Sequence, residues 1–92
     1  MNQIQIGRFI AASRKAQGLT QRQLADKLGI SDKTVSKWER GKGLPEVGLM
    51  LPLCASLDIT VNDLLSGERV SDANYQKKAE KNMMDLMKEN EE

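Results

Sequence analysis

A chain of 92 residues is long enough for one small domain with one modest core, and its 39% hydrophobic and 29% charged residues are typical of globular proteins. Aromatic residues make up only 3%, so the core has to be built from aliphatic side chains, which favours helices. One cysteine and no histidine exclude an internal disulfide, the usual zinc sites and histidine-based triads, and no long apolar run or secretory signal is present, so the cytoplasm is the expected location.

The segment 4–17 predicts the first helix. Its inward positions recur at helical spacing, and Gly18 directly after it suits a left-handed C-terminal cap. These positions are Ile6, Phe9, Ile10, Ser13 and Ala16.

Two short helices are predicted next, over about 20–28 and 31–40. A capping-box pattern opens the first, and Ser31 suits the N-cap of the second. The link over 29–31 contains a glycine and is too short for an antiparallel pair. The two helices should therefore cross at a steep angle, as in a helix-turn-helix.

Two further helices are predicted over 46–57 and 61–65, the second capped by Thr60. Pro52 removes one backbone hydrogen bond and crowds the carbonyl of Gly48, at a cost of about 3 kcal/mol in a helix interior. The first of these helices is therefore expected either to kink or to begin near Gly48. Its residues expected to be largely buried are Val47, Leu49, Met50, Leu53, Cys54 and Leu57.

Residues 71–90 are highly charged and carry a narrow apolar stripe, which predicts an amphipathic helix separate from the main core. The stripe consists of Ala79, Met83, Leu86 and Met87. We therefore expect a domain over 1–67 and a charged C-terminal helix over 68–92. This helix either packs on its own domain, dimerises, or serves as a linker or as a contact for another partner.

The net charge of +1 conceals a strong polarity along the chain. Residues 1–42 hold nine cations and three anions, a net charge of +6, whereas residues 43–92 hold five cations and ten anions, a net charge of −5. Charges further apart than a Debye length of about 8 Å are largely screened at physiological salt. A polyanion bound to the N-terminal half would therefore respond mainly to its positive charge.

Helical phase separates the segment 31–41 into two faces. Val35 and Trp38 lie three residues apart and form the inner face, because a core role is the usual one for a tryptophan at this spacing. The outward residues are Asp32, Lys33, Ser36, Lys37 and Arg40.

The outward residues suit the major groove of DNA. Lys33 and Lys37 can donate to guanine N7 and O6, while Asp32 either accepts from cytosine N4 or favours the helix dipole and repels wrong bases. The short hydroxyl groups of Ser36 and Thr34 suit a phosphate or a base edge. The predicted base contacts are Asp32, Lys33, Ser36 and Lys37, and the predicted phosphate contacts are Gln21, Arg22, Thr34, Arg40 and Lys42.

Glu39 would repel phosphate if it faced DNA. We therefore predict that it turns inward to form a partly buried, hydrogen-bonded ion pair with Arg14 of the first helix.

The segment GLTQRQLADKLGISDKTVSKWERGKGLP, residues 18–45, resembles the Cro and phage-repressor (XRE-like) type of bacterial helix-turn-helix domain, and the resemblance extends from about Ile6 to Leu65. It implies a five-helix bundle that binds a palindromic operator as a homodimer and controls transcription. Pro52 and the segment 68–92 depart from the family pattern. Functional positions implied by the resemblance are Gln21 for phosphate, Asp32, Lys33, Ser36 and Lys37 for bases, and Arg14 and Glu39 for a buried pair.

The sequence thus predicts an all-α, sequence-specific regulator that binds double-stranded DNA. The alternative is a protein-interaction module, such as an antitoxin-like or scaffold protein that uses its methionine-rich C-terminal helix. An enzyme is the weakest reading, because the acids are scattered and Cys54 has no histidine to activate it. We expect no catalytic residue, metal, cofactor, small-molecule ligand or membrane contact.

Overall fold

The structure is a computed structural model that describes residues 2–70, and these residues form helices and no strands. The all-α class and the five helices predicted for the domain are confirmed. The helices are α1 (Gln3–Ala16), α2 (Gln21–Leu28), α3 (Asp32–Glu39), α4 (Val47–Leu57) and α5 (Val61–Ser66). The amphipathic helix predicted for the C-terminal segment lies outside the described residues and stays a prediction.

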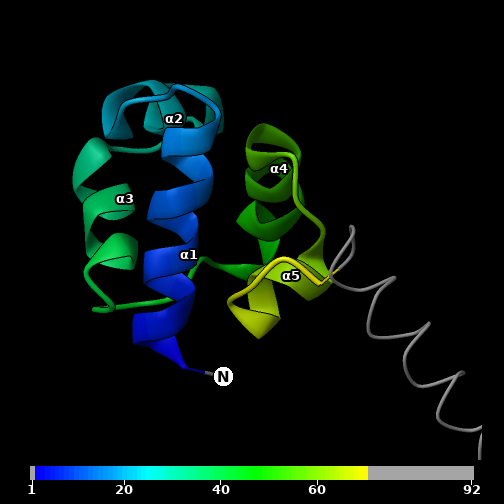
Figure 1. Ribbon diagram of the computed structural model, residues 1–92. Helices are drawn as coiled ribbons and strands as arrows, with labels where there is room; N and C mark the ends of the chain where they lie inside the picture. The colour runs from blue at the N-terminus through cyan, green and yellow to red at the C-terminus, as the bar shows by residue number, and fades with distance from the viewer. Residues whose placement is uncertain (1, 71–92) are drawn as a thin grey trace, which may run out of the picture.

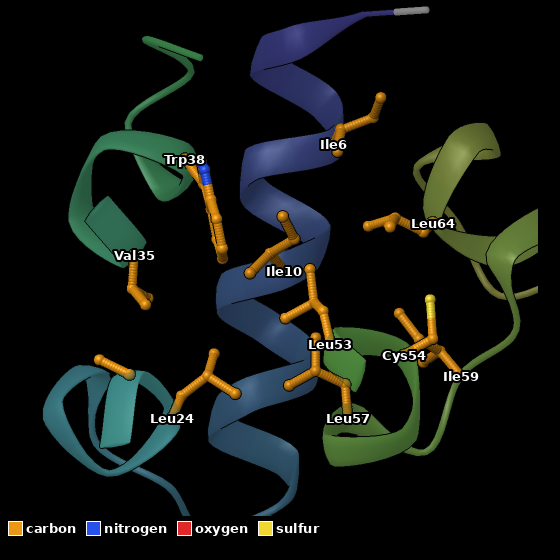
Figure 2. Packing of buried hydrophobic residues seen from close by; sticks show 11 residues of the cluster. Ile6, Ile10, Leu24, Val35, Trp38, Leu53, Cys54, Leu57, Ile59 and Leu64 are labelled. Atoms are coloured by element: carbon orange, nitrogen blue, oxygen red, sulfur yellow. The ribbon is translucent and has the colours of Figure 1, made fainter. Parts of the chain in front are cut away.

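Helix α1 is the centre of the bundle, with α3 on one side and α4 and α5 on the other (Figure 1). Ile10 is fully buried at the middle of α1, between α3 and α4 (Figure 2). Burying one aliphatic side chain of this size contributes about 1.5 to 3 kcal/mol. The core consists of Ile6, Ile10, Leu24, Ala25, Val35, Trp38, Leu53, Cys54, Leu57, Ile59 and Leu64.

The turn between α2 and α3 has the chemistry that the sequence predicts. Gly29 has φ +70° and ψ +30°, a left-handed conformation in which glycine carries no steric penalty. The N–H of Ile30 then donates to the carbonyl of Ala25 at 3.0 Å, and the hydroxyl of Ser31 accepts from the N–H of Thr34 at 3.3 Å. These bonds end one helix and begin the next within three residues, which forces the steep crossing.

Helix α4 differs from its prediction in two respects. Its first residue, Val47, is 85% exposed, so the expectation that it is largely buried is wrong, and Leu49 and Met50 are only half-buried. At 3.6 residues per turn Val47 lies about 120° around the helix from the fully buried Leu53. Pro52 lies inside α4, and the helix begins at Val47, in agreement with the expected start near Gly48.

The chain leaves α5 beside the C-terminal end of α4. Asp63 is buried, and its carboxylate accepts from the N–H of Thr60 at 3.0 Å and from the N–H of Val70 at 2.8 Å. Arg69 donates to the carbonyl of Asp58, the C-cap of α4, at 3.1 Å. These bonds fix residues 69 and 70 against the domain.

The backbone of α1 lies very close to the backbone at the end of α3 at Gly7. A Cβ atom at Gly7 would collide with the carbonyl oxygen of Trp38 and lie 3.1 Å from the carbonyl oxygen of Glu39. Sequence reasoning did not single out Gly7, because a glycine inside a helix gives no local signal of a close contact.

Replacing Gly7 with alanine should therefore lower the free energy of unfolding by about 1 to 3 kcal/mol, because α1 has to move away from α3. Gly48→Ala is the matched control, since a Cβ atom there meets open space, and it should raise the free energy of unfolding by about 0.5 to 1 kcal/mol. Urea denaturation of both variants measures the difference. Equal effects would contradict the close approach.

Candidate nucleic-acid interface

The outer face of α3 carries the four residues predicted to read bases. Asp32, Lys33 and Lys37 are exposed and Ser36 is half-buried, while Val35 and Trp38 of the same helix are buried in the core. Residues at these four outward positions lie within about 140° of the helix circumference. They form one face, and a groove that accepts α3 would meet all four side chains.

The residues predicted to contact phosphate lie at the start of α2, in the first turn of α3, where Thr34 is half-buried, and just beyond α3. Arg22, Arg40 and Lys42 are exposed, and Gln21 is half-buried. The first hydrogen bond inside α2 runs from the N–H of Leu24 to the carbonyl of Thr20 at 3.0 Å, so the amides of Gln21 and Arg22 come before it. Backbone amides at a helix N-terminus favour anions, which suits a phosphate at this point.

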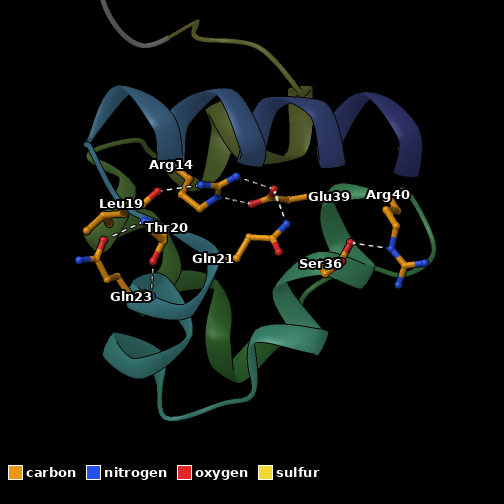
Figure 3. A network of polar contacts seen from close by, with 8 residues as sticks. All are labelled: Arg14, Leu19, Thr20, Gln21, Gln23, Ser36, Glu39 and Arg40. Carbon is orange, nitrogen blue, oxygen red and sulfur yellow. Dashed lines mark hydrogen bonds and ion pairs between the residues drawn. The ribbon is translucent and has the colours of Figure 1, made fainter.

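A buried ion pair connects α1 with the end of α3. Arg14 donates from Nε to Oε2 of Glu39 at 2.7 Å and from Nη2 to Oε1 at 3.0 Å, and the side chains are 10% and 7% exposed (Figure 3). The third nitrogen, Nη1, donates to the carbonyl of Leu19 at 2.7 Å. The hydrogen bond to Glu39 is the main cause that raises the pKa of Arg14. Arg14 thus links α1, the start of α2 and the end of α3.

Gln21 belongs to the same network, which sequence reasoning missed. Its Nε2 donates to Oε1 of Glu39 at 3.0 Å (Figure 3). A carboxamide has two N–H donors and an acceptor oxygen, so this bond leaves Gln21 able to meet a phosphate. The sequence carried no signal for the bond, because Gln21 and Glu39 are 18 residues apart and meet only when α2 and α3 cross.

Three other predicted contact residues have local partners. The hydroxyl of Thr34 lies 3.1 Å from that of Ser31, and Arg40 donates from Nε to the carbonyl of Ser36 at 3.3 Å. The carbon chain of Lys37 passes over Gly43, where a Cβ atom would lie 3.4 Å from Lys37 Cε. These contacts restrict the side chains, which lowers the entropy lost on binding.

The charge of this surface is positive once internal pairing is considered. Arg14 neutralises Glu39, so the exposed acids between Gln21 and Lys42 are Asp26 and Asp32. The exposed cations of the same stretch are Arg22, Lys27, Lys33, Lys37, Arg40 and Lys42. This surplus of positive charge matches a polyanion.

Other kinds of site find little support in residues 2–70. Within this range no helix is long and apolar enough to cross a membrane, and no group of three potential metal ligands is present. Burial raises the pKa of the Cys54 thiol, and the nearby charge of Asp63 raises it further. A protonated, buried thiol is a poor nucleophile.

The steep crossing of α2 and α3 over a three-residue turn, with the outer face of α3 exposed and basic, defines a helix-turn-helix domain. A family profile described as Helix-turn-helix matches residues 10–72. The chain therefore belongs to the helix-turn-helix family, of the Cro and phage-repressor type that its sequence resembles. This is a family of DNA-binding transcription regulators and not a class of enzymes.

Two curated relatives are named regulators. The chain is 40% identical over 57 residues to the HTH-type transcriptional activator BcrR of Enterococcus faecalis, over 62% of this chain and 28% of that protein. It is 36% identical over 67 residues to the cryptic phage CTXphi transcriptional repressor RstR of Vibrio cholerae, over 73% of this chain and 59% of that protein. The matched part is thus less than two thirds of each relative.

Solved structures show the same fold. The restriction-modification controller protein C.AhdI of Aeromonas hydrophila superposes with a TM-score of 0.63 at 30% identity, covering 68% of this chain and 91% of that one. The clp gene regulator ClgR of C. glutamicum superposes with a TM-score of 0.65 at 27% identity, covering 73% of this chain and 86% of that one.

Proposed function

We propose that this protein is a sequence-specific regulator of transcription that acts in the cytoplasm and binds a palindromic operator in double-stranded DNA as a homodimer. The observation that carries the proposal is the exposed basic face of α3, held in place by the network of Arg14, Gln21 and Glu39. The regulators among its relatives support it.

In this proposal α3 enters the major groove and α2 lies across the phosphate backbone. Lys33 and Lys37 donate to guanine N7 and O6, and Asp32 and Ser36 complete the contacts to bases. Phosphates meet the start of α2, the first turn of α3 and the segment beyond α3, where the contacting residues are Gln21, Arg22, Thr34, Arg40 and Lys42. Phosphate contacts fix the register of α3, and base contacts then select the sequence.

A binding selection from random DNA duplexes at fixed salt tests the proposal. We expect one enriched sequence with two-fold symmetry and half-site centres about 34 Å apart, one turn of DNA. An enriched single half-site would contradict the dimer, and no enrichment over the starting pool would contradict sequence-specific binding altogether.

Lys33→Ala and Arg22→Ala should behave differently in the same selection. Loss of Lys33 should cost about 1 to 3 kcal/mol and relax the preference at one base position, because a base contact is lost. Loss of Arg22 should weaken binding to all sequences alike, because phosphates carry no sequence information. Identical sequence profiles for the two variants would refute this division of roles.

A further inference from the structure

The two glycines that follow α3 differ in their backbone conformation. Gly41 has φ +73°, a left-handed conformation that glycine adopts without steric penalty and that the turn requires. Gly43 lies outside the left-handed region, so its backbone would accept other residues. A glycine loses more conformational entropy on folding than any other residue, which makes it unfavourable where the backbone does not need it. The turn therefore does not explain why position 43 lacks a side chain.

The side chain of Lys37 occupies the space beside Gly43. A Cβ atom at Gly43 would lie 3.4 Å from Cε of Lys37 and 3.9 Å from its Cδ and Cγ. Three consecutive carbons of the lysine thus lie within van der Waals range of the point where a side chain at position 43 would begin. The bare backbone of Gly43 leaves room for the carbon chain of Lys37, and a larger side chain would take that room.

Hydrogen bonds of the backbone fix the start of this loop relative to Lys37. The N–H of Lys42 donates to the carbonyl of Lys37 at 3.0 Å, and the N–H of Gly41 donates to the carbonyl of Trp38 at 3.0 Å. This pair of bonds is the Schellman motif, which ends a helix and holds the next residues against its last turn. Gly43 follows directly, so main-chain bonds place it beside Lys37.

Lys37 and Gly43 also line one pocket together with Glu46. The pocket has a volume of about 330 Å³, and Trp38 and Leu44 form part of its apolar wall. The methylene groups of a lysine pack on such a surface while the ammonium stays in water, and Lys37 is exposed overall. The exposed carboxylate of Glu46 adds a weak attraction for the ammonium. These features favour one orientation of Lys37.

We propose that Gly43 is a positioning residue for base recognition: it leaves room for the carbon chain of Lys37 and so sets the direction in which the ammonium leaves α3. The inference rests on the proposed function, in which Lys37 donates to guanine. A lysine has a flexible four-carbon chain, and a chain that is ordered before binding loses less entropy on binding. A branched side chain at position 43 displaces Lys37 and moves its ammonium away from the base acceptors.

Nuclear magnetic resonance of the free protein tests the contact without DNA. We expect nuclear Overhauser effects between the Cα hydrogens of Gly43 and the δ and ε hydrogens of Lys37, because a Cβ atom would take the place of one of those Cα hydrogens. This measurement needs no variant. Absence of these effects would overturn the proposal, whatever DNA the protein binds.

Binding selections from random duplexes test the consequence for recognition. Lys37→Ala identifies the base position that Lys37 reads, because the preference is lost there. Gly43→Val should reduce the preference at that same position by at least about fivefold, since a good base contact discriminates by about 5- to 150-fold. Gly48→Val is the matched control, because a Cβ atom there meets open space, and it should leave the profile unchanged.

A combined variant shows whether Gly43 acts through Lys37. Gly43→Val together with Lys37→Ala should have the profile of Lys37→Ala alone. A further change in the combined variant, or a parent-like profile of Gly43→Val, would overturn the proposal. A parent chain that enriches no sequence would refute the proposed function, and the role of Gly43 with it, even where the Overhauser effects are present. Circular dichroism of each variant establishes that the domain remains folded.

Discussion

Replacing Arg14 with methionine should lower the free energy of unfolding by about 3 to 5 kcal/mol. The guanidinium makes two hydrogen bonds to Glu39 and one to the carbonyl of Leu19, and the two charged side chains are 10% and 7% exposed. Methionine fills similar space but leaves the Glu39 carboxylate buried, with only the amide of Gln21 as its partner in this network. A loss of this size is a large part of the 5 to 15 kcal/mol typical of a whole domain.

Denaturant unfolding of three variants measures how much the ion pair contributes to the free energy of unfolding. Arg8→Met removes an exposed arginine from the same helix and should change the free energy of unfolding by no more than about 0.5 kcal/mol. Arg14→Met combined with Glu39→Leu should recover much of the loss, because no unpaired charge remains buried. Parent-like stability of Arg14→Met alone would show that the pair contributes little.

Binding of the operator should weaken by about 10³- to 10⁵-fold when salt rises from 50 to 200 mM, if a dimer contacts 6 to 10 phosphates. Each bound cation releases a counterion from DNA, so the logarithm of affinity falls linearly with the logarithm of salt concentration. Arg22, Arg40 and Lys42 are the exposed cations assigned to phosphates, and two copies of them give about six contacts, the lower end of that range. Fluorescence anisotropy with a labelled duplex measures the slope.

The slope of an Arg22→Ala variant serves as the control. Its magnitude should fall by about 2 for a dimer and by about 1 for a monomer, because each subunit loses one phosphate contact. The same series therefore reports the number of subunits on DNA. An affinity that does not change with salt would rule out phosphate contacts as a main source of binding.

The network around Glu39 connects stability with recognition. It fixes the end of α3 to α1 through Arg14 and holds Gln21, at the start of α2, through the same carboxylate. Helix α3 is thus held against both α1 and α2, so its outer side chains keep one orientation. This preorganisation lowers the entropy that is lost on binding. Loss of Arg14 should therefore reduce both folding stability and DNA affinity.

Local signals in the sequence predicted the helices of the domain. Thr20 and Thr60 cap helices as their patterns indicate, and Gly29 adopts the left-handed conformation that its place after a helix requires. The inward positions of α3 follow from helical phase, because Val35 and Trp38 differ so clearly from the polar residues between them. The pairing of Arg14 with Glu39 was anticipated because an acid facing DNA would be repelled.

The sequence by itself determined the helix boundaries, the short turn and the division of α3 into two faces, since each depends on residues within a few positions of one another. Tertiary structure alone decided which face of α4 is buried, that Gly7 touches the backbone of α3, and that Gln21 shares the carboxylate of Glu39. These features depend on how helices distant in sequence cross. In α4 nearly every residue is apolar, so helical phase could not distinguish the inner side from the outer one, and Val47 was assigned to the wrong side.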